Sequence, residues 1–550
     1  MLVGDFSVDA AAAVAAGLAK GQAAEGVANL VSKSMIAAIL QGDTARYRLL
    51  DTTRLYGLEK LTESNELREA RRRHAQHVRD LFGGAEADCE RLTKSEWLAR
   101  YGEQLDNARA ALEWCFAENG DAPLGVALAV ATVPLWVQLS LMSECRDWAE
   151  RALAELGAET TPDADRMRLC AALGWSLMFA VGRAKETRAA WETVLRIAEE
   201  RNEESHRLRA LWGLWIGRLN NGDFGGALES AQAFAQRVEG SSDIIDVMMA
   251  DRMLGTSLHY LGDQLRARGH IEDAIRHYDL LERQRLVARF QFDQRVTARY
   301  FQARILWLLG YPDQARQIAE ANIAEAETIG HALSFGSVLG QGVCPVALLT
   351  GDLVAARRYG QMLLDHAELH GLRLWRDWAW CFNRLIEARQ GDMQALQETR
   401  STLEHAGDAV ALPRYLILIA ELAARLGDAG EIESAMRMID GAIARCERAR
   451  ERWYEPELLR IKAELLFLKD GCSAAVAADA ILSKALRLAQ SQGARAWVLR
   501  IATSLFRLRS GQARRSRAEK LLSTTLAWFA EGHDTVDLQL AARALAGNRT

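Results

Sequence analysis

Two histidine pairs have a spacing that could place both rings on one side of a helix. His366 and His370 are four residues apart, as in zinc proteases, and His74 and His77 are three apart. In such zinc sites a Glu directly follows the first His, and a third protein ligand completes the coordination of the metal. Neither pair has these companions, so we expect surface or packing roles for all four side chains and no metal.

No other pattern of reactive residues indicates catalysis. The sequence has no Gly-x-Ser-x-Gly turn for a nucleophile, and its carboxylates are spread along helical segments, where pairing with Arg is the default role. It also lacks a Gly-rich loop followed by Lys and Ser or Thr, the element that cradles nucleotide phosphates. We therefore expect a protein that is not an enzyme and that has no cofactor and no nucleotide site.

Length and composition indicate a long helical chain in a reducing compartment. Its 550 residues exceed what one hydrophobic core usually serves, so several domains or one extended array are expected. Only 7 prolines interrupt segments of helical periodicity, and the 8 cysteines form no Cys-x-x-Cys pair. We find neither a signal-peptide pattern nor an apolar run of the roughly 18 to 20 residues that span a bilayer. A cytoplasmic location is expected.

A glycine that closes one helical segment and precedes the next recurs along the chain. The steps between these glycines are 40, 40, 48, 41, 40, 36, 44 and 40 residues. A fixed period in this range indicates stacked helical hairpins, whose tight turns need the backbone freedom of Gly. The closing glycines are Gly182, Gly222, Gly262, Gly310, Gly351, Gly391, Gly427, Gly471 and Gly511.

Small side chains keep phase with several of these glycines. Seven residues before the Gly the side chain is small in five of nine units, at Gly255, Ala303, Cys344, Ala420 and Ser504. Five residues after the Gly, Ala recurs at Ala227, Ala267, Ala315 and Ala356. This pattern resembles the tetratricopeptide repeat, although the period is nearer forty residues. The resemblance implies an all-α, right-handed superhelix of helical hairpins, which we place at residues 151–550.

The first eighty residues carry a second resemblance. They are similar to the winged-helix segment of large bacterial signalling ATPases of the STAND class, many of which are predicted transcriptional regulators. The winged-helix similarity lies in residues 3–11, 30–36 and 46–61. The similarity to these ATPases continues at 71–75, 96–98, 105–114 and 528–535, and the winged-helix segments and Leu105-Asp106-Asn107 are most specific. The resemblance implies a winged-helix domain at 1–80, a helical junction at 81–150 and a repeat sensor, with the ATPase missing or supplied separately.

Two activities of winged helices have little support in the residues themselves. Leu50 stands where many STAND proteins have the His that senses nucleotide phosphates, and Leu cannot donate a hydrogen bond; Asp51 is expected to cap a helix that starts at Thr52. Residues 1–80 hold 11 Lys plus Arg against 10 Asp plus Glu, and the whole chain carries a net charge of −5. We therefore expect no specific DNA binding by this chain alone.

Two functions remain open. The favoured one is a non-enzymatic sensor or protein-interaction region of a STAND-like ATPase or transcriptional regulator, with a possible ATPase domain in cis or in trans. The alternative is a free-standing tetratricopeptide-like scaffold for protein partners. In either case we expect a protein, a peptide or a small effector on the concave face of the repeats, and no membrane.

We place this binding surface on the first helix of each hairpin. Its exposed positions should precede the closing glycine by about ten, six and three residues, and aromatic and Arg side chains there are the types that dominate binding. The alternative is that the Trp residues fill gaps between hairpins. If the selected side chains are exposed, replacing them with Ala should weaken partner binding and scarcely change stability. They are Arg209, Trp212, Tyr300, Arg304, Trp307 and Trp378.

Overall fold

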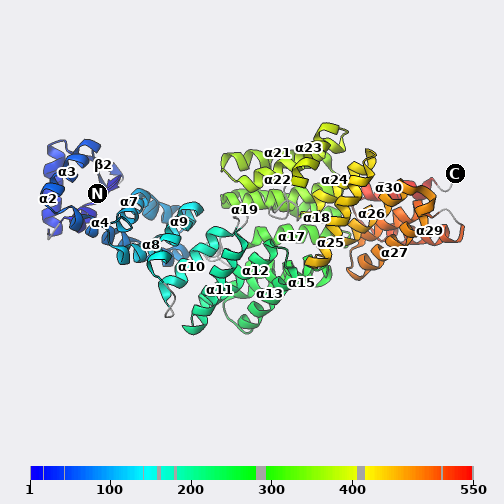
Figure 1. Ribbon diagram of the computed structural model, residues 1–550, viewed down its shortest axis with the longest axis horizontal. Coiled ribbons are helices and arrows are strands. Elements are labelled where there is room, and N and C mark those ends of the chain that lie inside the picture. Colours follow the sequence, from blue (N-terminus) through cyan, green and yellow to red (C-terminus); the bar gives the residue numbers. More distant parts are fainter. Residues whose placement is uncertain are drawn as a thin grey trace. The chain divides into compact units, whose positions relative to one another are not determined.

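The computed structural model describes most of the chain, and its elements are shown in chain order in Figure 1. The described residues are 2–15, 18–41, 44–139, 141–157, 163–178, 183–279, 293–405, 415–509 and 512–547. Two of the closing glycines, Gly182 and Gly511, lie outside them. By internal contacts the described residues form two compact units, which divide between Gly213 and Leu214. The predicted boundaries at residues 80 and 150 stay predictions.

The first unit begins with a small α/β segment. Its strands β1 (Asp5–Phe6), β2 (Ile36–Gln41) and β3 (Thr44–Leu49) form an antiparallel sheet in the order β1-β3-β2, and α1 (Val8–Val14) and α2 (Lys20–Ser32) lie between β1 and β2 in the chain. Its buried apolar side chains include Phe6 and Ile36. This sheet is where the described chain departs from an all-α fold, and the winged-helix assignment stays a prediction.

A run of helices follows the sheet. They are α3 (Asp51–Glu63), α4 (Leu67–Phe82), α5 (Ala85–Arg91), α6 (Lys94–Tyr101), α7 (Leu105–Cys115), α8 (Ala122–Gln138), α9 (Met142–Glu155), α10 (Ala164–Leu177), α11 (Ala184–Glu200) and α12 (Glu204–Asn220), which contains the division between the units. Asp51 does not cap α3. The N-cap is Leu50, and Asp51 is the first helical residue, paired with Arg54 at 3.2 Å. The prediction that Asp51 caps a helix starting at Thr52 is wrong because the helix begins one residue earlier.

Asn107 ties the N-terminal segment to the helices that follow it. Its Oδ1 accepts hydrogen bonds from the Val3 backbone N–H at 2.8 Å and from His74 Nε2 at 3.1 Å, and its amide donates to the Val3 carbonyl at 2.9 Å. Asn107 and His74 are both buried. These contacts supply a structural reason for the Leu-Asp-Asn segment, and the packing role predicted for His74 is confirmed.

Trp191 shows how aromatic side chains fill the space between helices of the first unit. It is fully buried on α11. A Cβ added at Gly174 on α10 would lie 2.6 Å from its ring, and one added at Gly213 on α12 would lie 2.2 Å from it. Close helix approach therefore requires glycine at both positions, and the gap-filling role weighed for the Trp residues is confirmed here.

The second unit is a stack of helical hairpins, which Figure 1 shows in green to red. After α12 the described helices are α13 (Phe224–Val238), α14 (Ile244–Tyr260), α15 (Gln264–Tyr278), α17 (Gln294–Leu309), α18 (Pro312–Ile329), α19 (Ala332–Ser337), the π-helix η2 (Val338–Val343), α20 (Cys344–Thr350), α21 (Leu353–Leu369), α22 (Arg373–Arg389), α23 (Met393–His405), α24 (Leu416–Asp428), α25 (Ile432–Ala449), α26 (Glu455–Asp470), α27 (Ala475–Ser491), α28 (Arg495–Leu508), α29 (Gln512–Trp528) and α30 (Val536–Ala546). Helices adjacent in the chain pack against each other. The fold is the expected tetratricopeptide-like array.

Most closing glycines have a positive φ, in line with the predicted tight turns that need the backbone freedom of Gly. Six of them have φ between 60° and 100°. Gly427 is the exception: it lies inside α24, where a Cβ would approach Leu465 Cδ2 to 2.4 Å, and the turn glycine is Gly430, with φ of 84°. The choice of Gly427 is therefore wrong, and with Gly430 the two neighbouring steps become 39 and 41 residues. The six are Gly222, Gly262, Gly310, Gly351, Gly391 and Gly471.

The array of the second unit turns back on itself. The Arg452 N–H donates to the Tyr260 carbonyl at 2.8 Å. The carboxylate of Glu531 accepts from the N–H groups of Asp313 and Gln314 at 3.0 and 3.1 Å, across more than 210 residues. Hairpins far apart in the sequence therefore pack on one another within the second unit.

One helical segment, Ala332–Thr350, has the length and composition to cross a membrane. The expectation that the chain has no such segment is corrected to that extent. Its mean hydropathy is 1.6, but 78% of it is buried inside the protein. Such burial is that of a core helix in a packed array.

Candidate binding sites

The side chains selected from the sequence are mostly buried. Tyr300 is 6% exposed and Arg304 1%, and Trp212, Trp307 and Trp378 are also buried. The prediction that these five are exposed is wrong. In the second unit, Arg304 and Trp307 contact aromatic side chains of later hairpins, Trp453 and Trp497. Partner binding by these residues stays a prediction.

Their burial reverses the expected effect on stability. A buried aromatic side chain replaced by Ala usually costs 3–5 kcal/mol. Tyr300→Ala should therefore lower the free energy of unfolding by about 3 kcal/mol, instead of leaving it nearly unchanged.

Arg209, which is half-buried, lines a cleft in the first unit. The cleft lies between α5, α8, α10 and α12 and has a volume of about 790 Å³, counting space open to solvent. Trp212 packs behind it, with its ring centroid 4.7 Å from that of Trp175. The lining has an apolar set, Val130, Val133, Pro134, Val137, Ala171, Ala172 and Trp175, and a polar set, Glu86, Cys89, Gln138, Arg168, His206 and Arg209.

Charges are concentrated on the polar side of this cleft. Arg209 Nη1 donates to Glu86 Oε1 at 2.8 Å, while Arg209 Nε is buried and has no hydrogen-bond partner in the described chain. Burial raises the pKa of Glu86, but Arg209, His206 and Arg168 outweigh burial and lower it overall. The pKa of His206 is lowered by burial and by Arg209, against the opposing effect of Glu203. At neutral pH two guanidinium groups thus face one carboxylate of the lining.

Sequence reasoning found one edge of this cleft and missed the rest. His206 and Arg209 are three residues apart on α12 and share a helix face, which was a usable signal. Glu86 and Arg168 come from α5 and α10, and nothing in their local sequence indicates that they meet Arg209.

The remaining predicted residues lie in the interior of the second unit. Arg304 Nη2 is 3.1 Å from His259 Nε2, and its guanidinium lies 4.5 Å from the centroid of the Trp453 ring. His259 Nδ1 in turn lies 2.8 Å from Gln264 Oε1, so the Nδ1–H tautomer lets Nε2 accept from Arg304. Burial and the Arg304 charge lower the pKa of His259 well below its ordinary value.

Trp378 and Tyr300 belong to the same interior. The Trp378 ring lies 4.7 Å from that of Tyr415, whose hydroxyl donates to the Gly340 carbonyl of η2 at 3.2 Å. A Cβ added at Gly342 of η2 would lie 3.0 Å from Tyr300 Cβ. The π-helix therefore packs against both tyrosines, and such helices are frequent at functional sites.

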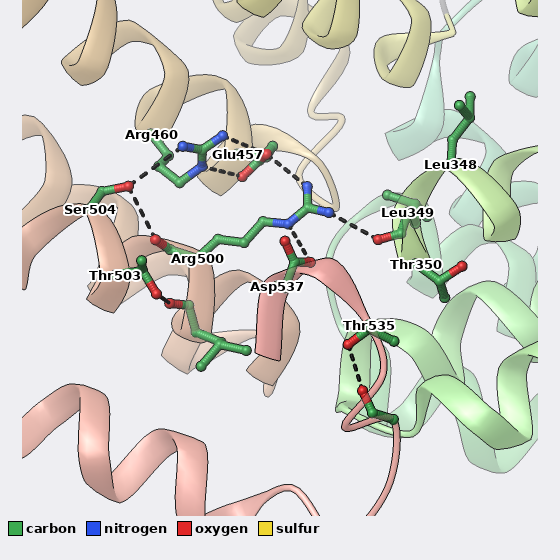
Figure 2. A network of polar contacts seen from close by, with 12 residues as sticks. Leu348, Leu349, Thr350, Glu457, Arg460, Arg500, Thr503, Ser504, Thr535 and Asp537 are labelled. Carbon is green, nitrogen blue, oxygen red and sulfur yellow. Dashed lines mark hydrogen bonds and ion pairs between the residues drawn. The ribbon is translucent and has the colours of Figure 1, made fainter. Parts of the chain in front are cut away.

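Trp307 adjoins a network of buried ion pairs, drawn in Figure 2. Arg500, 5.2 Å from the Trp307 ring, donates to Glu457 at 2.9 Å, to Asp537 at 2.8 Å and to the Leu349 carbonyl at 3.0 Å. Arg460 donates to both oxygens of Glu457, at 2.8 and 2.9 Å. Burial raises the pKa of Glu457, but the two arginines outweigh it and lower the pKa to about 2. The charges are mutually satisfied, so the network clamps α20, α26, α28 and α30 together.

In the pair formed by His366 and His370, His366 has a packing role. His366 Nε2 lies 2.8 Å from the Ala332 carbonyl, and its ring contacts Phe335. Within the ranges that the structure describes, His, Cys, Asp and Glu side chains form no group of three that could hold a metal ion.

This chain matches only part of its curated relatives. An uncharacterized protein of Rhizobium meliloti (strain 1021) is 27% identical over 379 residues, which are 66% of this chain and 36% of that protein. Putative HTH-type transcriptional regulators of Mycobacterium bovis and Mycobacterium tuberculosis are 36% identical over 160 residues, 28% of this chain and 17% of theirs. The chain thus spans about a third or less of these relatives. No protein-family model matches it.

Two solved structures cover more than half of this chain at low TM-scores. A Rap protein complexed with competence and sporulation factor has a TM-score of 0.37 at 11% identity, covering 77% of this chain and 97% of that one. The apo quorum sensor NprR from B. thuringiensis has a TM-score of 0.38 at 10% identity, covering 61% and 93%. Likeness at this level carries no inference about function.

Proposed function

We propose that this chain is the sensor region of a transcriptional regulator or STAND-like signalling ATPase, and that it binds an effector without chemical conversion. The proposal is supported by relatives named HTH-type transcriptional regulators, by the helical-hairpin array, and by the resemblance of residues 1–80 to STAND winged helices. The ATPase would act in cis or in trans. The alternative is a scaffold that binds protein partners with no nucleotide-linked switch.

The cleft of the first unit carries the proposal. Apolar side chains with a few converging polar groups are the usual composition of a small-molecule site, and here they come from four different helices. Within the described residues, Arg168 lies 3.9 Å from its carboxylate partner Asp165, and the buried Nε of Arg209 has no hydrogen-bond acceptor. Guanidinium groups bind carboxylates through paired, charge-assisted hydrogen bonds. The effector is therefore a molecule or peptide end with an apolar body and a carboxylate.

Thermal shift and calorimetry on the full chain test this effector chemistry. The probes are phenylacetate, octanoate and N-acetyltryptophan, each compared with its neutral amide. At least one carboxylate should bind saturably and raise the melting temperature, while its amide should not. Equal responses to acid and amide, or no saturable binding by any probe, would contradict the proposal.

A pair of arginine variants locates the site. Arg168→Gln should weaken binding at least tenfold, since one charged hydrogen-bonding group is worth roughly 1.5–3 kcal/mol. The matched control is Arg188→Gln on α11, which is exposed and outside the cleft lining. Unchanged affinity of Arg168→Gln would place binding elsewhere.

The two candidate functions, sensor and scaffold, differ in whether the chain works with a regulatory ATPase. Reading the DNA next to this coding region should reveal an in-frame or adjacent ATPase segment if the chain is a sensor. Adding the effector should then change the ATP hydrolysis rate of that ATPase in the presence of this chain. An unchanged rate would favour the scaffold.

A further inference from the structure

Helix α8, which forms one wall of the cleft in the first unit, contains a proline in its interior. Pro134 lies within α8, and the helix continues through it to Gln138. Proline has no backbone N–H, so the carbonyl of Val130 cannot accept the hydrogen bond that residue i+4 gives it in a regular α-helix. A backbone carbonyl is a strong acceptor that needs a donor. The helix therefore leaves the Val130 carbonyl without its regular partner.

This carbonyl lies on the side of α8 that lines the cleft. The residues of α8 in the lining follow helical spacing and are all half-buried, and Val130 and Pro134 lie in the middle of the stripe that they form. The hydrogen bond from residue i+4 runs along the helix between the two residues that it joins, so the Val130 carbonyl faces the cleft. The stripe consists of Val130, Val133, Pro134, Val137 and Gln138.

The charged groups of the cleft come from the other helices. Arg168 lies on α10 and Arg209 on α12, whereas α8 has no charged residue. Glu86 is the one carboxylate of the described lining, and it already accepts from Arg209 at 2.8 Å. An ammonium group placed against α8 would lose hydration and find no free counter-charge in this lining. A neutral amide N–H suits the Val130 carbonyl better.

We propose that the effector of this cleft is an acylated apolar amino acid, whose carboxylate binds Arg168 and Arg209 and whose amide N–H donates to the Val130 carbonyl. The apolar side of the cleft holds the side chain. A free N-acyl amino acid and the C-terminal residue of a peptide share this chemistry, because in both one carbon carries the carboxylate, the side chain and the amide. The inference rests on the function proposed for the cleft and adds the donor that the effector must carry.

A pair of nearly identical probes tests the donor. N-acetylphenylalanine and O-acetyl-3-phenyllactate differ only in an amide N–H that the second replaces with an ester oxygen. In calorimetry on the full chain at pH 7, the amide should bind about three- to tenfold more tightly, the value of one neutral hydrogen bond. Phenylalanine itself, with an ammonium group, should bind more weakly than the amide.

The outcomes separate this inference from the function proposed for the cleft. If the amide and the ester bind equally, or phenylalanine binds as tightly as the amide, the cleft still binds carboxylates but the inference about the donor is overturned. If none of the three probes binds saturably, and 3-phenylpropanoate does not bind either, the function proposed for the cleft is contradicted together with the inference.

Pro134→Ala shows whether the Val130 carbonyl is the acceptor. The substitution restores the missing N–H, so the carbonyl is satisfied within the helix and the preference for amide over ester should disappear. The matched control is Pro123→Ala in the first turn of α8, where a proline displaces no helical hydrogen bond; it should keep the wild-type preference. A preference that persists in Pro134→Ala overturns the inference.

The measured quantity in these variants is the ratio of the two affinities, because removing Pro134 can also straighten the helix and reshape the cleft. If Pro134→Ala binds neither probe, Pro134→Val, which keeps more apolar volume, takes its place with the same two outcomes. If neither variant binds, the comparison of amide and ester on the wild type decides.

A longer probe distinguishes the two sources of the effector. The peptide acetyl-Ala-Ala-Phe ends in the same residue as N-acetylphenylalanine. Tighter binding of the peptide would support a peptide end as the effector, and tighter binding of N-acetylphenylalanine would support a small acylated amino acid.

Discussion

Trp528 packs directly on Gly310, 218 residues earlier in the chain. A Cβ added at Gly310 would lie 2.4 Å from Trp528 Cζ3 and 3.1 Å from Phe529 Cε1. Gly351 meets Val536 in the same way, at 2.5 Å. Each of these two glycines therefore has two roles. It allows the left-handed turn of its hairpin, and, because it has no side chain, it lets a hairpin from later in the chain pack against that turn.

Gly310→Ala should destabilise the second unit more than Gly391→Ala. Both glycines have a left-handed backbone, with φ of 92° and 100°, but no atom of the described residues lies within 4 Å of a Cβ added at Gly391. Backbone strain alone costs about 1 kcal/mol, and the clash with Trp528 should add about 2 kcal/mol more. Urea unfolding of both variants measures the difference. Equal losses would show that Trp528 moves away at no cost.

Glu457→Gln should lower the free energy of unfolding at pH 7 by about 3 kcal/mol, because it leaves Arg460 and Arg500 without their shared buried carboxylate. The pKa of Glu457 is lowered from 4.5 to about 2, so its contribution is complete above about pH 4.5 and is lost as pH falls toward 2. The difference in free energy of unfolding between Glu457→Gln and wild type should therefore shrink as pH falls from about 4.5 toward 2.

Urea unfolding at pH 7, 4 and 3 measures this difference for Glu457→Gln. The control is Glu464→Gln, since Glu464 pairs with the same Arg460 at 2.6 Å but is 42% exposed; it should cost under about 1 kcal/mol. A difference between Glu457→Gln and wild type that does not change with pH would contradict the role of the carboxylate.

His74 should make the first unit sensitive to mild acid. Burial lowers its pKa from 6.5 to about 4, against a smaller opposing effect of the Asn107 hydrogen bond. The unfolded chain therefore takes up the proton first, and stability is lost as pH falls from 6.5 toward 4, by about 3 kcal/mol in all.

Hydrogen exchange of α4 at pH 7 and pH 5 detects the effect of His74. In His74→Gln the loss of hydrogen-exchange protection between these pH values should be smaller than in wild type, because Gln can still donate to Asn107 but does not titrate. His533→Gln, at an exposed position, should behave as wild type. The same acid sensitivity in His74→Gln would assign the effect to another group.

DNA binding by this chain alone should be weak and nonspecific. Arg72 pairs with Asp121 at 3.1 Å, Arg73 donates to the Val14 carbonyl at 2.9 Å, and Arg79 pairs with Asp80, so these cations of α4 are already engaged within the first unit. Fluorescence anisotropy with duplex DNA should show binding that disappears as salt rises to physiological ionic strength. A sequence-specific footprint under those conditions would contradict this expectation.

The sequence by itself determined the hairpins and most of their turns. A left-handed backbone is a local requirement that glycine meets at low cost, so the positions of Gly222, Gly262, Gly310, Gly351 and Gly391 could be read without knowing what packs on them. The wrong choice of Gly427 has the same local origin, because a second glycine lies three residues later and it is this one that forms the turn. Spacing alone does not distinguish a turn glycine from one that allows two helices to approach.

Only the tertiary structure decided which faces of the hairpins are open. Tyr300, Arg304 and Trp378 are all buried, and their burial depends on residues of other helices, such as Tyr415 beside Trp378 and Trp453, which lies more than a hundred residues after Arg304. The small rotation from each hairpin to the next accumulates along an array, and no single repeat encodes the sum. That sum decides whether such side chains face an open groove or, like Arg304 and Trp378 here, are packed inside the protein.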